Sequence, residues 1–414
     1  MTNFEELEKF LLGINFENSI AKFIIKLNVN FIMELAEFAD EFGPEKVLEV
    51  YDPETGMKGF TVIDNTALGP AKGGIRMTST VDVKEVWRLA RAMTWKNALA
   101  DLPFGGGKSG IVWDKKNKDH AEKKLDFVRE FSKAIKPICP SEYVAAPDIN
   151  TSEKEMQVFV EANGNFNAAT GKPLKLCTVD KKTGKACGLP HELGSTGYGV
   201  AHSTEVALKH EKILIKDATI AIEGFGNVGT FTFKKLEEMG SKIVAVSDSK
   251  GCLYNSDGIK YKDISKIKEE KGTVIAGDGK KLSGDKIFEL EVDVLIPAAL
   301  PDVINRKNMN KVKAKIIIEA ANIPIPLDVE EELHKKGILV VPDFVANAGG
   351  VISSYAEYIG RGPVYMEKLV RDKLHQNTDV VLKEAFKKKI SVRKAGMEIA
   401  MKRVREGMRK RIGR

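Results

Sequence analysis

The stretch ATIAIEGFGNVGTFTFKKLEEMG, residues 218–240, decides the fold. A β-branched run at 218–223 leads into three glycines spaced G-x-G-x-x-G, and a helical pattern then runs to Gly240. Between a strand and a helix, this spacing is typical of a dinucleotide-binding turn. The first glycine allows the tight turn, the second lets a pyrophosphate approach, and the third lets the helix pack on the strand. The cofactor residues that we predict here are Gly224, Gly226, Asn227, Val228 and Gly229.

The next strand sets the ribose side of this predicted site. Asp248 follows the run KIVAVS, residues 242–247, and in such folds an acidic residue here binds the ribose hydroxyls of NAD. Ser249 and the nearby Lys242 and Lys250 could instead accept the 2′-phosphate of NADP. The sequence therefore predicts NAD or NADP and leaves the choice open.

Further β-branched runs follow at 292–297, 314–319 and 337–342, with helical stretches between most of the runs. This alternation predicts a parallel, doubly wound α/β sheet. Asn322 and Asn347 come just after two of these strands, where ligands of such sheets bind. Each could contact the nicotinamide or the substrate, or could simply form a turn.

The chain has 414 residues, which fits two domains, and the loop-rich segment 165–195 marks the junction between them. Upstream of it we expect a helix over 4–40, a strand over 57–65 and a helix over 82–100. Asp82 is a candidate N-cap for the last of these helices, and Glu85 would complete a capping box.

Composition and charge narrow the class of protein. The excess of positive charge behind the net +7 lies in the C-terminal segment, because the residues from Leu382 onward carry 13 Lys/Arg against 3 Glu. An apolar stripe in that segment favours a docked amphipathic helix over a nucleic-acid arm; it consists of Met397, Met401, Val404, Met408 and Ile412. No apolar run is long enough for a membrane helix, and the acidic N-terminus does not resemble a signal peptide. The four cysteines do not suggest a disulfide framework, so we expect a reducing, cytoplasmic location.

Three lysines and an aspartate lie in glycine- or proline-containing motifs: Lys72 in GPAKGGIR, Lys96 on the predicted helix, Lys108 in PFGGGKSG and Asp148 in VAAPDINT. Lys108 is not a Walker lysine, because Leu102 stands where that motif needs its opening glycine. The glycine triplet before it could instead let the chain pass closely under a small ligand. Taken singly, Lys72 could be a lysine in an exposed turn, Lys96 a lysine at a helix end and Asp148 the N-cap of a helix. Clustered in a closing cleft, lysines lower each other's pKa and can serve as acid or base near pH 7.

The motifs GPAKGGIR, TWKNALADLPFGGGKSG, AAPDINT, STGYGV, GFGNVG, SDSKG and PDFVANAGGVISS together resemble, in order and spacing, the glutamate dehydrogenase family. That family belongs to the amino-acid dehydrogenases of glutamate, leucine, phenylalanine and valine. The resemblance runs from about residue 45 to the C-terminus. It implies a substrate and oligomerisation domain at 1–193 plus 370–414, with the C-terminal helix returning to it. A Rossmann-like dinucleotide domain at 194–369 and a homohexamer are also implied.

The resemblance also implies roles for single residues. Lys108 would activate the water that attacks the imino carbon, Asp148 would exchange protons, and Lys96 would hold the substrate α-carboxylate. Thr196 and Asn227 would contact the cofactor, and Asn322 and Asn347 would lie near the nicotinamide and the substrate. In glutamate enzymes a lysine and a serine bind the γ-carboxylate, and here these are Lys72 and Ser354. Ala146, Thr170 and Val351 also match the glutamate-type pocket.

We therefore expect NAD(P)-dependent oxidative deamination of L-glutamate to 2-oxoglutarate and ammonium, and its reverse. The alternatives are a leucine, valine or phenylalanine dehydrogenase and a non-catalytic dinucleotide-binding regulatory homologue. The chain departs from the family pattern in CTVDKKTGKACGLPHELGSTGYG, which is longer than usual and carries Cys177, Cys187 and His191. We interpret it as a surface insertion rather than a metal site, and expect no metal.

Overall fold

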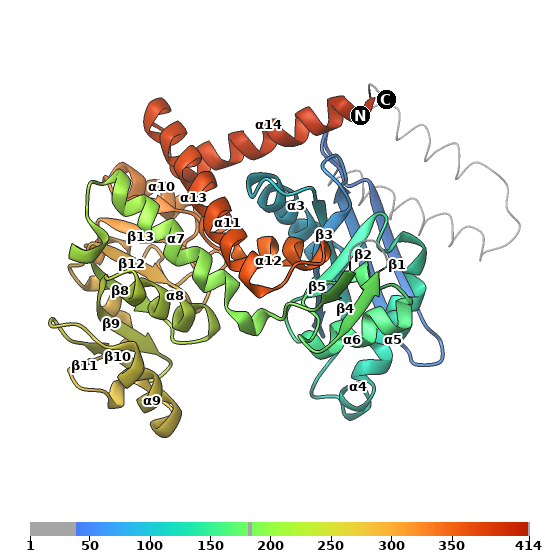
Figure 1. The fold of residues 1–414 in the computed structure, drawn as a ribbon, viewed down its shortest axis with the longest axis horizontal. Helices are drawn as coiled ribbons and strands as arrows, with labels where there is room; N and C mark the ends of the chain where they lie inside the picture. Colours follow the sequence, from blue (N-terminus) through green and yellow to red (C-terminus); the bar gives the residue numbers. More distant parts are fainter. Residues whose placement is uncertain (1–38, 181–183, 413–414) are drawn as a thin grey trace, which may run out of the picture.

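The computed structural model describes residues 39–180 and 184–412, which form two sheets at opposite ends of the molecule (Figure 1). The long helix α14, Val392–Ile412, runs along the top edge from one to the other. The helix expected over 4–40 falls outside the described residues except at its end, where Asp40 forms a β-bridge with Gly43.

The first sheet has the order β1-β2-β4-β3-β5, with β3 parallel to both of its neighbours and β2 antiparallel to both of its own. Successive residues of a strand face opposite sides, so Val62 packs on helix α3 while Ile63 packs on the side of α5 and α6. The elements of this region are β1 (Lys46–Tyr51), β2 (Lys58–Asn65), β3 (Ala71–Thr78), α3 (Val83–Leu99), β4 (Gly105–Val112), α4 (Lys118–Glu122), α5 (Lys124–Ala134), β5 (Tyr143–Pro147) and α6 (Glu153–Asn163).

Helix α3 confirms the predicted helix over 82–100. The side chain of Asp82 caps it by accepting a hydrogen bond from the backbone N–H of Glu85 at 2.7 Å. The capping box is not completed, because the Glu85 carboxylate pairs with Arg76 at 2.6 Å instead. This helix end is thereby tied to strand β3.

The glycine triplet of PFGGGKSG opens strand β4, and the role expected for it is wrong. A Cβ on Gly105 would lie 1.8 Å from the carbonyl oxygen of Asn65, and one on Gly106 would lie 2.3 Å from the backbone nitrogen of Thr94 on α3. The glycines therefore admit the neighbouring strand and helix α3 to the β4 backbone. They do not form a floor for a ligand.

The second sheet has the order β11-β10-β9-β8-β12-β13-β14. Its five strands β9, β8, β12, β13 and β14 are parallel, as predicted, but β10 and β11 add an antiparallel edge that the sequence analysis missed. Ile220 and Ile222 face one core and Ala221 the other, so both faces are covered. The elements are α7 (Ser195–His210), β8 (Thr219–Glu223), α8 (Asn227–Glu238), β9 (Lys242–Asp248), β10 (Gly251–Tyr254), α9 (Tyr261–Lys271), β11 (Lys280–Leu282), β12 (Val294–Pro297), β13 (Ile316–Ile318), α10 (Leu327–Lys335) and β14 (Leu339–Val341).

The segment that departs from the family pattern lies between the two sheets in the sequence. It forms a hairpin of β6 (Cys177–Asp180) and β7 (Gly184–Cys187). A disulfide joins Cys177 to Cys187 across it, which corrects the expectation that the cysteines stay reduced. Cys139 and Cys252 are free and buried. The two paired cysteines are therefore not available as metal ligands.

The chain ends in α11 (Asp343–Ala346), α12 (Gly349–Tyr358), α13 (Pro363–Lys388) and α14. Helix α14 docks by its apolar stripe, as predicted: Val404 is fully buried, and Met397, Met401 and Met408 pack on the same core. The side chain of Ile412 lies outside the described ones. Arg403 of α14 donates to the carbonyl oxygens of Ala98 and Leu99, at 2.9 and 2.7 Å, and so caps the C-terminal end of α3.

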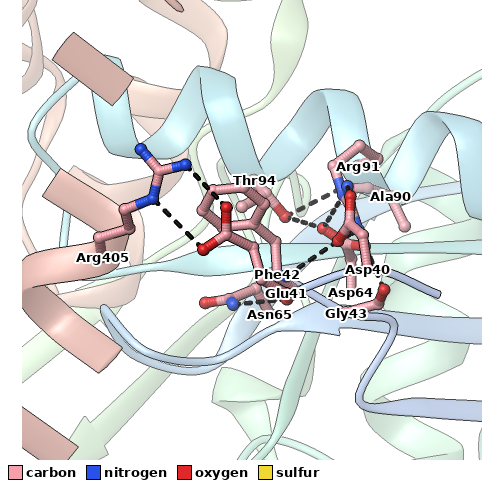
Figure 2. A network of polar contacts seen from close by, with 10 residues as sticks. All are labelled: Asp40, Glu41, Phe42, Gly43, Asp64, Asn65, Ala90, Arg91, Thr94 and Arg405. Carbon is pink, nitrogen blue, oxygen red and sulfur yellow. Dashed lines mark hydrogen bonds and ion pairs between the residues drawn. The ribbon is translucent and has the colours of Figure 1, made fainter. Parts of the chain in front are cut away.

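A polar network fixes the other side of α3 (Figure 2). Arg91 of α3 forms ion pairs with Asp64 of β2 at 2.9 Å and with Asp40 at 2.6 Å. Burial raises the pKa of Asp64, although Thr94 and Arg91 both donate to its carboxylate. Arg405 of α14 reaches Glu41 in the same network, at 2.7 Å. Helix α3 is thus held by β2, by β4 and by the C-terminal helix.

We predict that Gly106→Ala destabilises the protein, because the added methyl meets backbone that cannot move aside. The expected loss is about 1–3 kcal/mol in the free energy of unfolding, measured by guanidinium denaturation. Gly226→Ala is the matched control, because a Cβ there has no atom within 4 Å among the described residues. Equal stabilities of the two variants would contradict the close approach of α3 to β4.

Candidate functional site

The site begins with side chains on one face of the first sheet. Because side chains alternate along a strand, Lys72, Gly74 and Arg76 share one face of β3. Lys108 shares a face of β4 with Gly106, and this is the face that α3 covers. Gly74 leaves room for the end of the Lys108 side chain, since a Cβ on it would lie 3.3 Å from Nζ of Lys108.

Lys108 and Asp148 form the central pair. Nζ of Lys108 lies 2.7 Å from Oδ2 of Asp148, which follows β5, and Lys108 is only 6% exposed. Arg76 contacts the same carboxylate oxygen through Nε at 3.0 Å. Burial alone would raise the pKa of Asp148, but the cations Lys108 and Arg76 outweigh it and hold this pKa below its ordinary value. The aspartate is therefore a carboxylate, in direct contact with Nζ of Lys108.

Lys96 approaches this pair from α3. Its Nζ donates to Oδ1 of Asn347 at 2.5 Å, and the amide nitrogen of Asn347 lies 3.1 Å from Oδ1 of Asn322. The two asparagines singled out from the sequence are thus linked to each other and to Lys96. Burial lowers the pKa of Lys96 to about 8; the carboxylate of Asp343 opposes this shift and the Lys108 cation adds to it.

Lys72 lies on β3, the strand next to the one that carries Lys108. It is 1% exposed, and its Nζ donates to the carbonyl oxygen of Ala145 at 2.7 Å. Thr170 donates its backbone N–H to that same carbonyl, and its hydroxyl bonds to Ser354 of α12 at 3.0 Å. Burial lowers the pKa of Lys72 well below its ordinary value, against the attraction of Glu357 and with help from Lys172 and Lys108.

Two further pocket residues lie beside these groups. Ala146 stands opposite Gly74 in the register of β5 with β3, and it is half-buried. Val351 is also half-buried on the first turn of α12, three residues before Ser354. Every substrate residue predicted from the sequence therefore lies on β3, β5, α3, α12 or the segments next to them.

The charge balance of this group of side chains leaves Lys72 and Lys96 without a contacting anion among the described residues. In the part of the chain that the structure describes, neither Lys72 nor Lys96 forms an ion pair. A buried cation without a contacting anion is costly. The arrangement therefore suits a ligand that brings carboxylates to both lysines.

Sequence reasoning missed a buried ion pair behind the pocket. Lys172 and Glu357 contact each other at 2.7 Å with side chains 1% and 0% exposed, and Glu357 also accepts from the backbone N–H of Gly171 at 2.6 Å. Glu357 is three residues past Ser354 on α12, so the pair anchors both halves of the Thr170–Ser354 contact. The available signal was a glutamate as the one charged residue of VISSYAEY, residues 351–358.

The dinucleotide turn has the geometry that its glycines predict. Gly224 has φ +98°, in the region that favours glycine, and a Cβ on Gly229 would lie 2.0 Å from the carbonyl oxygen of Gly224. At Gly226 a Cβ would meet no described atom within 4 Å, and α8 begins at the exposed Asn227. The open glycine and the free helix N-terminus fit a pyrophosphate. Val228 is half-buried in the first turn of this helix.

On the neighbouring helix, Thr196 stands in the first turn of α7. A Cβ on Gly350 would lie 3.1 Å from its hydroxyl oxygen, and one on Gly349 would lie 2.0 Å from the carbonyl oxygen of Ser195. The glycines of VANAGG therefore allow α12 to meet the start of α7. This contact brings the cofactor side of the molecule next to the substrate side.

Asp248 ends β9, as predicted, but its carboxylate already accepts hydrogen bonds from four donors of the protein. Lys268 contacts Oδ2 at 2.7 Å, the backbone N–H groups of Lys250 and Val274 donate at 2.9 and 2.8 Å, and Thr273 donates at 3.1 Å. Burial would raise its pKa, and these donors outweigh burial and lower it. Ser249 and Lys250 beside it are exposed.

Comparison with known proteins agrees with this geometry. Residues 44–164 match the family described as Glu/Leu/Phe/Val dehydrogenase, dimerisation domain, and residues 188–411 match Glutamate/Leucine/Phenylalanine/Valine dehydrogenase. The chain belongs to the Glu/Leu/Phe/Val dehydrogenase family. It is an amino-acid dehydrogenase with the two-domain α/β fold expected from its sequence.

Two curated relatives are similar over most of their length. A glutamate dehydrogenase of Aeropyrum pernix is 40% identical over 372 residues, covering 85% of this chain and 86% of that protein. An NADP-specific glutamate dehydrogenase of Saccharolobus shibatae is 37% identical over 392 residues, covering 89% and 90%. Among solved structures, the glutamate dehydrogenase of Peptoniphilus asaccharolyticus has a TM-score of 0.78 at 28% identity, covering 92% of this chain and 97% of that one.

We predict that carboxylate binding weakens as the pH rises through about 8. A lysine with a lowered pKa is charged below that pKa and neutral above it, so Lys96 attracts an anion only on the acid side. The measurement is the dissociation constant of glutarate against pH. Lys96→Arg should lose the part of the decrease centred near pH 8, since its guanidinium stays charged. An unchanged profile in that variant would assign the decrease to another group.

Proposed function

We propose that this protein catalyses the oxidative deamination of L-glutamate to 2-oxoglutarate and ammonium with NAD or NADP, and the reverse reaction. The observation that carries the proposal is the position of Lys72, a buried cation without a contacting anion beside the Thr170–Ser354 pair. A pocket for an apolar side chain has no use for such a lysine, because an unpaired buried charge is costly. A γ-carboxylate would pair with it. The similarity to glutamate dehydrogenases supports the same choice.

The substrate would lie between two lysines. Lys96 would hold the α-carboxylate and Lys72 the γ-carboxylate, with Ser354 adding a hydrogen bond to the latter. This places Cα between the two charged groups and close to the Lys108–Asp148 pair. Holding both carboxylates would fix the position of Cα. A reacting atom that is already in position lowers the entropic part of the barrier.

Lys108 and Asp148 would handle the protons. A bound nicotinamide coenzyme would supply the hydride acceptor, and loss of hydride from Cα would leave an iminium. Lys108, acting as the base, would take a proton from water as its oxygen bonds to the imino carbon. Asp148, in contact with Nζ, would receive that proton from Lys108 and pass one to the departing nitrogen. As the carbon–nitrogen bond breaks, Lys108 would take the hydroxyl proton, so that 2-oxoglutarate forms and ammonia leaves, to be protonated to ammonium.

The coenzyme would lie along the turn at Gly224, Gly226 and Gly229 and the start of α8. Asn227 and Val228 would contact its pyrophosphate, Thr196 and Asn322 its nicotinamide half, and Asp248 and Ser249 its ribose end. The carboxylate of Asp248 already accepts from four donors, so exposed Ser249 and Lys250 are the free groups at that end.

We further propose a homo-oligomer, with the hexamer that the resemblance implies. The cytoplasmic location expected from the sequence stays a prediction, and the Cys177–Cys187 disulfide counts against it. The match of residues 44–164 to a dimerisation domain supports the oligomer. Among the helices that the structure describes, none is both long and apolar enough to cross a membrane. Light scattering coupled to size-exclusion chromatography and cell fractionation test these two points.

We predict that Lys108→Ala reduces kcat by about 100-fold or more, because it removes the group that activates water. Coenzyme affinity should stay close to that of the wild type, since Lys108 lies in the first sheet and the coenzyme turn follows β8. Steady-state kinetics and coenzyme titration by fluorescence measure the two. A variant that keeps substantial kcat would refute the role of Lys108 as base.

We predict that Lys72→Leu lowers kcat/KM for glutamate by about 100-fold or more, because the γ-carboxylate loses its charged partner. The ratio of kcat/KM for leucine to that for glutamate should rise. The control is Lys58→Leu, an exposed lysine on the adjacent part of the same sheet. The panel covers glutamate, leucine, valine and phenylalanine, each with NAD and NADP. A wild type that prefers leucine to glutamate would favour the branched-chain alternative.

A further inference from the structure

Outside the pocket, three potential metal ligands meet between two packed helices. His202 and Glu205 lie one turn apart on α7, and His375 lies on α13. Their ligand atoms are the only such group found among the described residues, and none of the three belongs to a motif used above. His202 is buried, while the side chains of Glu205 and His375 are 39% and 38% exposed.

The three atoms form a compact triangle. Nδ1 of His202 lies 3.1 Å from Nε2 of His375, which lies 2.8 Å from Oε2 of Glu205, and the third side measures 3.6 Å. In a tetrahedral zinc site with bonds of about 2.0–2.1 Å, neighbouring ligand atoms stand roughly 3.3 Å apart. The sides of the triangle scatter around that value. A cation above it would contact all three atoms with little movement of the side chains.

Protons alone do not satisfy this cluster. Nε2 of His375 has two partners but carries at most one hydrogen, so one contact must lack an optimal donor. A cation at the centre would use one lone pair from each of the three atoms.

The three side chains also suit a metal by their chemistry. Each imidazole can offer one nitrogen lone pair, and the carboxylate can offer an oxygen. Two imidazoles and one carboxylate are a donor set that zinc uses in proteins.

We propose that His202, Glu205 and His375 bind a divalent cation of the zinc type, with a fourth position open to solvent. The half-exposed side chains of Glu205 and His375 give the cation its route in and leave room for a water ligand. This revises the expectation, from sequence alone, that the protein has no metal site.

The position of the site suggests a structural role. Helix α13 passes from one core to another: Met366, Val370 and Leu374 pack with Leu102 and Phe104, whereas Val381 and Leu382 pack with the second sheet. His375 stands where the helix changes from the first core to the second, and the adjacent Lys373 pairs with Asp101 at 2.6 Å. A cation here fastens α13 to α7, the first helix of the dinucleotide region, and so stiffens the connection between the two parts.

The test uses untagged protein freed of metal by dialysis against a chelator. Calorimetric titration with ZnCl2 should give one equivalent per chain, and Co2+ should give the visible absorption bands of a tetrahedral site. Zn2+ should also raise the melting temperature. These readouts do not depend on dehydrogenase activity, so failure of the metal proposal and failure of the proposed reaction are distinguishable.

The variants are His375→Ala and Glu205→Gln, whose side chains are exposed enough for folding to tolerate the change. Each should weaken Zn2+ binding by about 100-fold or more and remove the thermal shift. His210→Ala is the matched control: it lies on α7 and bonds to Asp379 of α13 at 2.9 Å, outside the cluster, and should bind Zn2+ as the wild type does. Absence of stoichiometric binding, or binding that both ligand variants retain, would overturn the proposal.

Discussion

The close approach of helix α3 to strand β4 is the constraint on which the proposed active site depends. Gly106 has no side chain, so the backbone of Thr94 can lie where a Cβ would be. Lys96, two residues further along α3, is thereby brought over the strand that carries Lys108. Any side chain at position 106 would separate these two lysines. The proposed substrate carboxylate site and the proposed catalytic base are therefore positioned by one packing contact.

The second theme is an excess of positive charge in a buried space. Lys72, Lys96, Lys108 and Arg76 share the pocket, and Asp148 is the carboxylate that contacts two of them. Lys72 and Lys96 have no ion-pair partner among the described residues, and burial lowers the pKa of each. In the proposed complex a dicarboxylate would complete the balance, and the two lysines would recognise it by the distance between its charges.

Much of this could be predicted from sequence, because some signals are local. The turn at Gly224–Gly229 specifies its own geometry, and the stripe of α14 specifies its docking. The pocket was different, since Lys72, Lys96 and Asp148 are each ordinary alone and only their joint resemblance to a family assembled them. The Lys172–Glu357 pair and the His202–His375 contact join positions far apart in the chain, so no spacing reveals them. The glycine triplet was expected to lie under a ligand, but strand β2 and helix α3 lie against it instead.

The cap that Arg403 places on α3 has a consequence for the order in which the protein is made. The carbonyls of Ala98 and Leu99 end the helix that carries Lys96, and their donor comes about 300 residues later in the chain. Domains generally fold as units during synthesis, starting from the N-terminus. The first sheet can form early, but the end of helix α3 gains this cap only after the C-terminal segment has been synthesised. A chain without that segment would lack the cap on the helix that carries Lys96.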